Sequence, residues 1–544
     1  FNGEIYNYKA LRKKLEAEGY RLRTQTDTEV ILGMYELYGA KCLDYFNGMF
    51  AFAIFDRKED KLFIARDRVG IRPLYYFNNQ NGFAFASEIK ALLKCPFVKR
   101  AVNKNVIGQY VQFRYVDNPS TLFDGVLKLE PGHYMMYDGK NINIQKYWDV
   151  EVFEKNQGSL EENLIALEAL LEESVKLRMI SDVSLGAFLS GGIDSSLIVA
   201  LMAKLSNAPV KTFSVGFKDS NYSELPYAKS IADKFKTDHH ELYISHKDIM
   251  DNLYSAVWHR DAPVSESSDI PILLLSREAK KKVSVILTGE GSDEIFAGYP
   301  KYAFDKYSKA FWFKTFFNNS PMSSIVNSLP YKYRKIKLAY NTLRIENDLE
   351  RFASWFSSFR RDSVNKLFTD DFINNNHSAS GYSQIKGVSD LDKMMYLDLK
   401  YWLTDNLLER GDKMLMSASV EGRVPFLDFN VVEQAYRIKD SFKIHGNCRK
   451  YIVKKLAEKY IPAENIYRKK VGFYIPVGDW FRRELRDFVY DHLMSRRFIE
   501  RGIFKPSEIE NIVVSHCSGK QNYEKELWML INLEIWFRSY IDCS

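Results

Sequence analysis

The chain of 544 residues is 46% hydrophobic and 15% aromatic, which is enough to bury large cores and predicts about two to four domains. Its 77 basic and 70 acidic residues leave a formal charge of +7. So small an excess favours small-molecule chemistry over a nucleic-acid or membrane-surface partner. Because no apolar run reaches the ~20 residues of a membrane span, we expect a soluble protein with neither nucleic acid nor a membrane as a partner.

The cysteines give no sign of a metal site or of a disulfide framework. They stand far apart, without C-x-x-C spacing or a nearby histidine cluster, at Cys42, Cys95, Cys448, Cys517 and Cys543. Zinc sites and disulfide-rich folds need closer, patterned cysteines. A cytoplasmic location, where thiols stay reduced, therefore fits the sequence.

The first part of the chain has the pattern of short strands. Residues 48–77, GMFAFAIFDRKEDKLFIARDRVGIRPLYYF, alternate apolar runs with charged or glycine-containing turns. This alternation predicts antiparallel hairpins. The polar stretch 154–163 is the predicted boundary between two domains, 1–150 and 151–544.

After this boundary, strands and helices alternate. Residues 159–180 have apolar residues at helical spacing, with Ser159 as the expected N-cap and Glu162 three residues later. Strands are expected at 183–190, 210–217, 239–244 and 283–289, and the helices between them begin at Asp194, Ser223 and His246. Such alternation is typical of an α/β fold with a parallel sheet covered by helices. From residue 398 onward the chain is expected to be largely helical.

The segment FLSGGIDSS, residues 188–196, predicts an anion-binding loop. A buried strand is expected to end at Leu189, and a helix is expected to begin a few residues later. Backbone N–H groups, hydroxyls and the positive end of the helix then converge on one point. Gly191 and Gly192 allow a ligand to approach the backbone closely.

The side chains of this loop suit a phosphate bound with a cation. Ser190 and Ser195 can donate to phosphate oxygens, and Asp194 fits beside them if a magnesium ion bridges its carboxylate to the phosphate. The structural alternative is an ordinary glycine-rich turn with a serine or aspartate cap. The complete S-G-G-x-D-S-S pattern after a buried strand favours the phosphate loop.

A second polar segment, TGEGSDE at 288–294, follows the last predicted parallel strand. It places two glycines and three carboxylates at a strand end, where α/β sheets bind their ligands. A capped helix start on a solvated turn is the structural alternative. The presence of the loop at 188–196 favours a shared site for both segments.

These segments resemble known families. The pattern SGGxDS is similar to the pyrophosphate loop (PP-loop) of ATP pyrophosphatases, which cleave ATP between its α and β phosphates. Residues 287–302, 417–428, 447–462 and 468–481 resemble segments of the glutamine-hydrolysing asparagine synthetases. The resemblance covers nearly the whole chain. It implies an α/β PP-loop ATPase domain with a helical C-terminal part.

The resemblance implies roles for four charged residues. Asp194 and Asp293 would hold magnesium on the pyrophosphate, while Glu290 would take a proton from the attacking ammonia. Lys450 would stabilise the charge that develops in the transition state, although a lysine in a basic helix is usually only solvated. Tyr299 is expected to support Glu290.

The resemblance also implies the ATP contacts. Leu189 and Val215 match positions whose main chain contacts adenine, and Thr288 and Gly289 match the segment near the ribose and α-phosphate. The expected ATP-binding residues are Leu189, Ser190, Gly191, Gly192, Asp194, Ser195, Ser196, Val215, Thr288 and Gly289.

The N-terminal segments 1–7, 26–30, 65–76 and 85–92 resemble a class II glutamine amidotransferase domain. Such a domain is an N-terminal nucleophile hydrolase, an α+β sandwich of antiparallel sheets. By this resemblance, the glutamine-binding residues are Asn2 and Gly3 at the oxyanion hole and Glu4 and Asp27 at the α-amine of glutamine.

In that family the nucleophile is a cysteine at the first position of the mature chain, and its free amine acts as the base. Phe1 is not that residue. We expect the sequence to be a truncated copy of a longer enzyme, with an incomplete domain that lacks glutaminase activity. The alternative is a native short form that uses free ammonia.

The reaction implied by the resemblance is amidation of aspartate. The expected substrates are aspartate, ATP, and glutamine or ammonia, with a β-aspartyl-AMP intermediate, and a homodimer is one assembly that the resemblance allows. Arg277, Arg410 and Lys413 are candidates for binding the α-carboxylate of aspartate.

Other functions stay open at this point. Relatives with the same two domains amidate other carboxylates in secondary metabolites or surface polysaccharides. A non-catalytic scaffold and a tRNA-modifying adenylate-forming enzyme are further alternatives, although the modest charge of +7 does not favour RNA binding.

Overall fold

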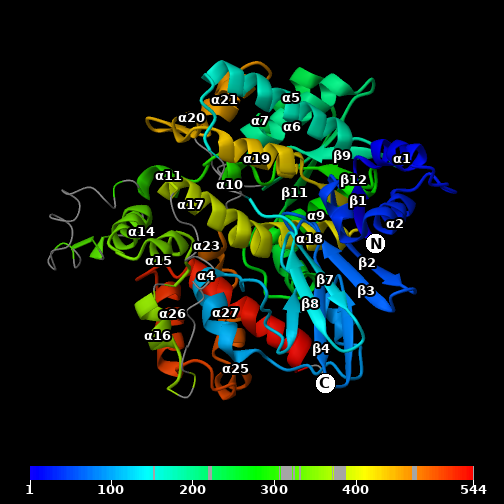
Figure 1. Cartoon of the computed structure of the whole chain (residues 1–544). Coiled ribbons are helices and arrows are strands. Elements are labelled where there is room, and N and C mark those ends of the chain that lie inside the picture. The colour runs from blue at the N-terminus through cyan, green and yellow to red at the C-terminus, as the bar shows by residue number, and fades with distance from the viewer. Residues whose placement is uncertain are drawn as a thin grey trace.

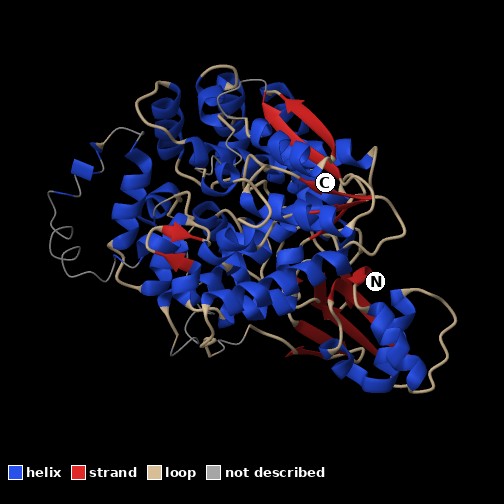
Figure 2. Ribbon diagram, turned by 90° about the horizontal axis from the view of Figure 1, so that it is seen from above, coloured by secondary structure: helices blue, strands red, loops and turns tan. Residues whose placement is uncertain are grey.

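The structure is a computed structural model. It describes all residues except 151–153, 218–222, 306, 308–321, 323–324, 327, 330–332, 360, 371, 373–387, 469–474 and 543–544. In Figure 1 the antiparallel strands, in blue and cyan, lie on one side of the molecule, beside the C-terminal helices in red. From above, the molecule is mainly helical, and most strands lie toward the side of the two chain ends (Figure 2).

The N-terminal part contains two antiparallel sheets. The larger has the order β1-β2-β3-β7-β8, with β1 Asn2–Ile5, β2 Gly48–Asp56, β3 Lys61–Arg66, β7 His133–Tyr137 and β8 Ile142–Lys146. The smaller has the order β5-β4-β6, with β4 Tyr75–Asn79, β5 Gly82–Ala86 and β6 Val126–Lys128. Buried side chains join the two sheets, among them Ile64, Tyr76 and Met135. The predicted antiparallel sandwich is confirmed.

Helices cover the other face of the larger sheet. α1 (Tyr8–Ala17) and α2 (Asp27–Tyr38) bury apolar side chains against β2 and β3, and the shared core contains Leu15, Val30, Met34, Phe50 and Phe63. Thr26 caps α2 by accepting a hydrogen bond from the Glu29 N–H. This packing fixes the N-terminus of α2, and hence Asp27, beside β1.

The hairpin expectation for residues 48–77 is only partly correct. β2 and β3 form the first hairpin, but β3 then pairs with β7, and β4 pairs with β5 and β6 in the other sheet. Buried Asp67 explains the change of sheet, because its carboxylate accepts hydrogen bonds from the N–H groups of Ile71 and Arg72, each at 2.9 Å. These bonds hold a turn in which the chain leaves the first sheet.

The second part contains the predicted parallel sheet. Its order is β11-β10-β9-β12-β13, with β9 Leu185–Phe188, β10 Lys211–Phe217, β11 Asp238–Ile244, β12 Val285–Leu287 and β13 Glu421–Arg423. All of its pairings are parallel. Because the chain continues from β9 to β10 on one side and places β12 on the other, the strand order reverses beside β9. Open α/β sheets bind ligands at such a point.

Helices link and surround these strands. α5 (Leu160–Arg178) begins with the expected capping box between Ser159 and Glu162. The connecting helices are α6 Ile193–Leu205, α7 Leu225–Phe235, α8 His246–Arg260 and α9 Asp269–Lys280. The middle of α6 is buried and joins the largest core cluster among the described residues through residues Leu197 to Met202.

The C-terminal part is largely helical, as predicted. Its longer segments are α17 Asp390–Leu397, the π-helical η7 Asp398–Leu408, α18 Glu409–Met416, α19 Phe429–Arg437, α24 Arg486–Leu493, α26 Pro506–Cys517 and α27 Glu524–Trp536. Shorter ones are α20 Asp440–Lys443, α21 Tyr451–Ala457, α22 Ala463–Tyr467, α23 Val477–Arg482, α25 Arg496–Glu500, η8 Pro425–Leu427 and η9 Phe537–Ile541, with a small hairpin of β14 Ile444–His445 and β15 Cys448–Arg449.

The remaining described elements are short. They are η1 Gly39–Asp44, α3 Ile89–Leu92, η2 Lys104–Val106, α4 Ile107–Phe113, α10 Ser292–Ile295, α11 Pro300–Phe304, α14 Arg334–Leu343, α15 Asp348–Ser354 and α16 Arg361–Leu367. α27 lies against α4 (Figure 1), so the end of the chain packs on the N-terminal part. No described helix combines the length and the apolar character that crossing a bilayer demands.

Candidate functional site

The predicted phosphate loop closes between β9 and α6. The Ser190 Oγ lies 3.0 Å from the Ser195 Oγ, and the Gly192 N–H donates to the Ser190 Oγ at 3.3 Å. Gly191 has φ +68°, and a Cβ there would lie 2.4 Å from the carbonyl carbon of Tyr227 on α7. The loop therefore requires glycine and keeps both hydroxyls at the start of the helix.

The end of β12 packs directly against this helix start. A Cβ on Gly289 would lie 2.8 Å from the Asp194 Cβ and from the Ser195 nitrogen. The Thr288 hydroxyl is buried, and among the described residues it has no hydrogen-bond partner; the same holds for the hydroxyls of Ser196 and Ser292. Buried hydroxyls without partners are unusual, and those of Thr288 and Ser292 flank the segment predicted to contact the nucleotide.

Lys450 joins the two predicted acidic segments. It precedes α21 with φ +52°, and its Nζ lies 2.7 Å from the Asp194 Oδ1 and 2.8 Å from the Asp293 Oδ1. Its side chain is only 6% exposed. The solvated-lysine alternative is thus wrong, since a buried ammonium is held between two carboxylates from two different strand ends.

Gly298 makes room for this cluster. A Cβ at that position would lie 1.8 Å from the Asp293 Oδ1 and 2.4 Å from the Lys450 Cε. The Gly298 N–H donates to the Asp293 carbonyl at 2.8 Å, and its carbonyl accepts from the Arg449 Nη1 at 2.5 Å. Only glycine leaves space for the lysine and the carboxylate to meet.

Glu290 pairs with an arginine from α18. The Arg410 Nη2 lies 2.6 Å from the Glu290 Oε1, and the Arg410 Nε lies 3.8 Å from the Asp269 Oδ1. The Arg410 Nε is buried without a hydrogen bond among the described residues. Glu290 itself is partly exposed, so the pair faces accessible space beside the phosphate loop.

The predicted support of Glu290 by Tyr299 is wrong. The Tyr299 hydroxyl donates to Glu294 instead, and the Trp402 Nε1 donates to that hydroxyl at 3.4 Å. Burial, with a further contribution from the Asp293 charge, raises the pKa of Glu294 to about 8. The short α10 directs Glu294 into the core while Glu290 lies before the helix, so one tyrosine reaches only the former.

The three candidates for an α-carboxylate ligand lie in different surroundings. Arg277 is at the surface, where its Nη1 donates to the Asn252 Oδ1 at 2.6 Å. Lys413 is buried between the Asp261 Oδ2, at 2.8 Å, and the Ser87 carbonyl, at 3.0 Å. Of the three, Arg410 is the one that contacts a predicted catalytic residue.

Arg468 is a site residue that our sequence predictions did not include. Its Nη1 lies 2.8 Å from Glu224, its guanidinium lies 4.3 Å from the Tyr227 ring centre, and its Nη2 reaches the Ser190 carbonyl at 3.5 Å. Arg468 begins the segment 468–481, which resembles a segment of the asparagine synthetases. A basic side chain in that segment could have indicated a phosphate contact. Residues 469–474 of that segment lie outside the described part of the chain.

The predicted adenine contacts lie on adjacent strands. The Leu189 N–H donates to the Phe213 carbonyl at 2.9 Å, and its carbonyl accepts a hydrogen bond from the Ser214 hydroxyl. Val215 lies in β10, opposite Leu242 of β11. The Leu189 N–H is thus already used within the sheet, while its carbonyl retains a second lone pair for a ligand.

The predicted glutamine-binding residues cluster at the first strand. Asn2 Nδ2 donates to the Ser87 Oγ at 3.2 Å, and the Asp27 Oδ2 accepts from the Ile5 N–H at 3.0 Å. Gly3 has φ +135°, and a Cβ there would lie 1.9 Å from the Met49 carbonyl oxygen.

Glu4 connects this cluster to the second part of the chain. Its Oε1 lies 3.4 Å from the Nη2 of Arg423, at the end of β13. Burial, together with the charges of Glu421 and Asp27, outweighs Arg423 and raises the pKa of Glu4 to about 7. The predicted glutamine site is therefore electrostatically coupled to the parallel sheet.

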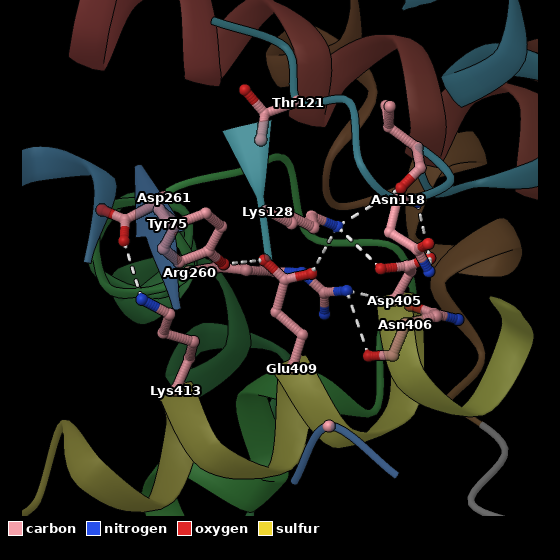
Figure 3. A network of polar contacts seen from close by, with 12 residues as sticks. Tyr75, Asn118, Thr121, Lys128, Arg260, Asp261, Asp405, Asn406, Glu409 and Lys413 are labelled. Atoms are coloured by element: carbon pink, nitrogen blue, oxygen red, sulfur yellow. Dashed lines mark hydrogen bonds and ion pairs between the residues drawn. The ribbon is translucent and has the colours of Figure 1, made fainter. Parts of the chain in front are cut away.

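Buried ion pairs join the two parts around α18 (Figure 3). The Lys128 Nζ lies 3.1 Å from the Asp405 Oδ1 and 3.2 Å from the Glu409 Oε2. Close by, Lys413 extends from the same helix to Asp261 (Figure 3). Because α18 also carries Arg410, the helix that bridges the two parts contributes directly to the predicted site.

Family models match both parts of the chain. A model described as "Asparagine synthase" matches residues 166–538, and one described as "Glutamine amidotransferase domain" matches residues 1–148.

Curated relatives match over nearly the same length. The asparagine synthetases (glutamine-hydrolyzing) 1 and 3 of Bacillus subtilis are 33% and 32% identical; the matches cover 98% and 99% of this chain and 84% and 87% of the relatives. Amidase chyE of Penicillium rubens is 27% identical over 86% of this chain and 72% of its own. Since the first model spans well over half of the chain and two relatives match almost all of it, the chain belongs to the asparagine synthase family.

Proposed function

We propose that this chain catalyses the ATP-dependent amidation of aspartate to asparagine through a β-aspartyl-AMP intermediate. The observation that supports this most strongly is the placement of Lys450 between Asp194 and Asp293. The lysine and the two carboxylates, which could hold a divalent cation, lie beside a glycine-rich loop at a strand-order reversal, and together they would stabilise a departing pyrophosphate.

ATP would bind along the ends of β9, β10 and β12. Ser190, Ser195 and the loop N–H groups would hold the β and γ phosphates, and Thr288 and Gly289 would border the α-phosphate. The unpartnered Thr288 hydroxyl supports this placement, because a ligand oxygen would satisfy it.

The carboxylates of Asp194 and Asp293 fit a magnesium ion. Among the described residues, no group of three or more potential ligands occurs. Magnesium is usually bound through one or two protein carboxylates together with substrate phosphates and water, so this pair is sufficient. Such an ion would neutralise phosphate charge, and Lys450 would donate to phosphate oxygens.

Aspartate would bind beside Glu290 and Arg410. Arg410 is the candidate that contacts Glu290, at 2.6 Å, so its guanidinium would bind the α-carboxylate while the β-carboxylate attacks the α-phosphorus of ATP. Attack expels pyrophosphate and forms a mixed anhydride. Glu290 would then take a proton from ammonia as nitrogen attacks the activated carbonyl and AMP leaves.

The N-terminal domain would supply nitrogen from glutamine where the cysteine nucleophile of that family is present, and free ammonia would be the nitrogen source otherwise. Asn2 and Gly3 would contribute to an oxyanion hole, while Glu4 and Asp27 would contact the α-amine of glutamine. Their clustering at β1 supports a common substrate pocket. A related acceptor carboxylate is the second candidate, favoured by the match to an amidase.

The test supplies ATP, magnesium and ammonium with a panel of carboxylic amino acids, and measures pyrophosphate and amide product. Pyrophosphate and asparagine in equal amounts with aspartate would support the proposal, whereas release with a different acid would identify another acceptor. Asp194→Asn should abolish release. Asp182→Asn, at an exposed position in the turn before β9, is the matched control and should leave it unchanged.

A further inference from the structure

A cavity lies between the two parts of the chain, and its lining is separate from the phosphate loop. Its volume is about 580 Å³, and its lining residues come from α3 and the loop after it, from α8 and from the end of the chain. Pockets of roughly 300–1,000 Å³ are the size that small organic ligands and cofactors occupy. None of the residues assigned above to ATP, aspartate or glutamine lines it.

Basic side chains line part of the cavity. They are Lys90, Lys94 and Arg100, and among the described residues the lining includes no carboxylate. Lys90 is held in place by Glu88 at 2.8 Å and Asp261 at 2.9 Å. Lys94 and Arg100 are exposed at the rim. The cavity therefore favours an anion.

The opposite wall is aromatic and rigid. Trp258 is 44% exposed, yet its ring stacks on that of Tyr540 with a centroid separation of 5.1 Å and an interplanar angle of 11°. The Tyr540 hydroxyl donates to the Trp258 carbonyl at 2.5 Å. One helical turn earlier, Tyr254 is 42% exposed, and its hydroxyl lies 2.9 Å from the His492 Nε2.

Exposed rings that are held in fixed orientations suit a planar ligand. Heterocyclic bases stack on aromatic side chains in nucleic-acid complexes, largely independently of which base it is. Large exposed aromatic side chains in a basic cavity also mark a binding site rather than an ordinary surface.

We propose that this cavity is a binding site for a nucleotide-class anion, with the base on Trp258 and the phosphate between Lys94 and Arg100. The site is separate from the ATP site and does not depend on the proposed reaction. Its walls belong to both parts of the chain, so a bound ligand stabilises their contact by mass action.

The cavity also touches the ion pairs that hold α18. Lys90 shares Asp261 with Lys413, which lies one turn after Arg410 on that helix. Because Lys90 also lines the cavity, a ligand bound there lies against one member of this group of ion pairs. The site is thus placed next to the connection between the two predicted active sites.

The experiment measures binding of inosine monophosphate (IMP) to the full chain by calorimetry, and variants of the cavity lining separate this binding from binding at the phosphate loop. Separate titrations with inosine and with inorganic phosphate measure how tightly the ring and the charged group bind alone. We expect saturable IMP binding in the submillimolar range, about tenfold or more tighter than either fragment.

Two variants and two matched controls locate the site. Lys94→Glu and Trp258→Ala should each weaken IMP binding by at least about tenfold. Lys99→Glu, an exposed lysine outside the lining, and Tyr243→Ala, an exposed aromatic position on β11, should not change it. Thermal unfolding checks that each variant folds. If Trp258→Ala does not fold, Lys94→Glu alone tests the location of the site.

Three results would overturn the proposal. The first is absence of saturable IMP binding to the full chain. The second is binding that survives both Lys94→Glu and Trp258→Ala. The third is phosphate binding as tight as that of IMP, which would remove the role of the aromatic wall.

Discussion

The Nζ of Lys450 lies 2.7 Å from the Oδ1 of Asp194, although the two residues are 256 positions apart in the chain. Asp293 contacts the same ammonium. One lysine therefore fixes the relative positions of the loop after β9 and the loop after β12, and it does so in a nearly buried setting where a charge has its largest effect. The proposed chemistry depends on this placement.

Lys450→Met should lower kcat/KM for aspartate-dependent pyrophosphate release by about 10²–10³, because a cation aimed at the developing phosphate charge is lost. Lys454→Met, on the helix that Lys450 precedes, where the lysine Nζ instead lies 3.6 Å from the Cys448 Sγ, should leave the rate nearly unchanged. Steady-state assays with ammonium as nitrogen donor measure both. Equal losses in the two variants would contradict the role of Lys450.

Glu290→Gln should separate the two chemical steps. If the carboxylate takes the proton from ammonia, amide formation falls by about 10²–10⁴, while the first turnover of pyrophosphate is much less affected. Rapid-quench measurement of pyrophosphate and asparagine in one reaction tests this. A parallel fall of both products would assign Glu290 to substrate binding instead.

Arg410→Lys should raise the KM for aspartate by about tenfold or more, because a lysine cannot bind a carboxylate as a fork. The KM for ATP should stay the same. Arg277→Lys, at the surface beside Asn252, is the control. An unchanged aspartate KM in Arg410→Lys would leave the α-carboxylate without its proposed ligand.

Lys413→Met should destabilise the fold by about 3–5 kcal/mol, because it leaves Asp261 buried with one cation fewer. Burial alone would raise the pKa of Asp261, but Lys413 and Lys90 outweigh it and hold this pKa below its usual value. Urea unfolding measures the loss. Lys281→Met, which removes an exposed pair with Glu278, should change stability by less than about 1 kcal/mol.

Stability should fall in mild acid because of His516. Its Nε2 donates to the Gly478 carbonyl and its Nδ1 accepts the Tyr523 N–H, so the buried ring is held neutral. Burial lowers the pKa of His516 to about 4. Between about pH 6.5 and pH 4 the unfolded chain binds this proton and the native state does not. The resulting loss in the free energy of unfolding grows by about 1.4 kcal/mol per pH unit, to about 3 kcal/mol.

Comparison of the wild type with His516→Gln isolates this contribution. Glutamine does not titrate, so the acid-dependent part assigned to His516 should disappear from unfolding free energies measured between about pH 7 and pH 5. An identical pH dependence in both proteins would show that the native ring protonates as readily as in the unfolded chain.

Local patterns predicted the strand and helix types well. The alternation of strands and helices after residue 159 gave the parallel sheet, and Ser159 with Glu162 gave the start of α5, because capping and periodicity depend on neighbours in sequence. The loop at 188–196 was recognisable for the same reason, since its glycines and hydroxyls act through the backbone of one turn.

Contacts between distant segments could not be obtained in this way. β4 lies in the other sheet because the chain turns at the buried Asp67. Tyr299 contacts Glu294 and not Glu290 because α10 directs Glu294 into the core. The sequence by itself determined which residues bear charge and hydroxyl groups at each strand end. Only the packing of α18 and α21 decided that Arg410 meets Glu290 and that Lys450 meets both aspartates, because ion-pair geometry depends on distances that local sequence does not constrain.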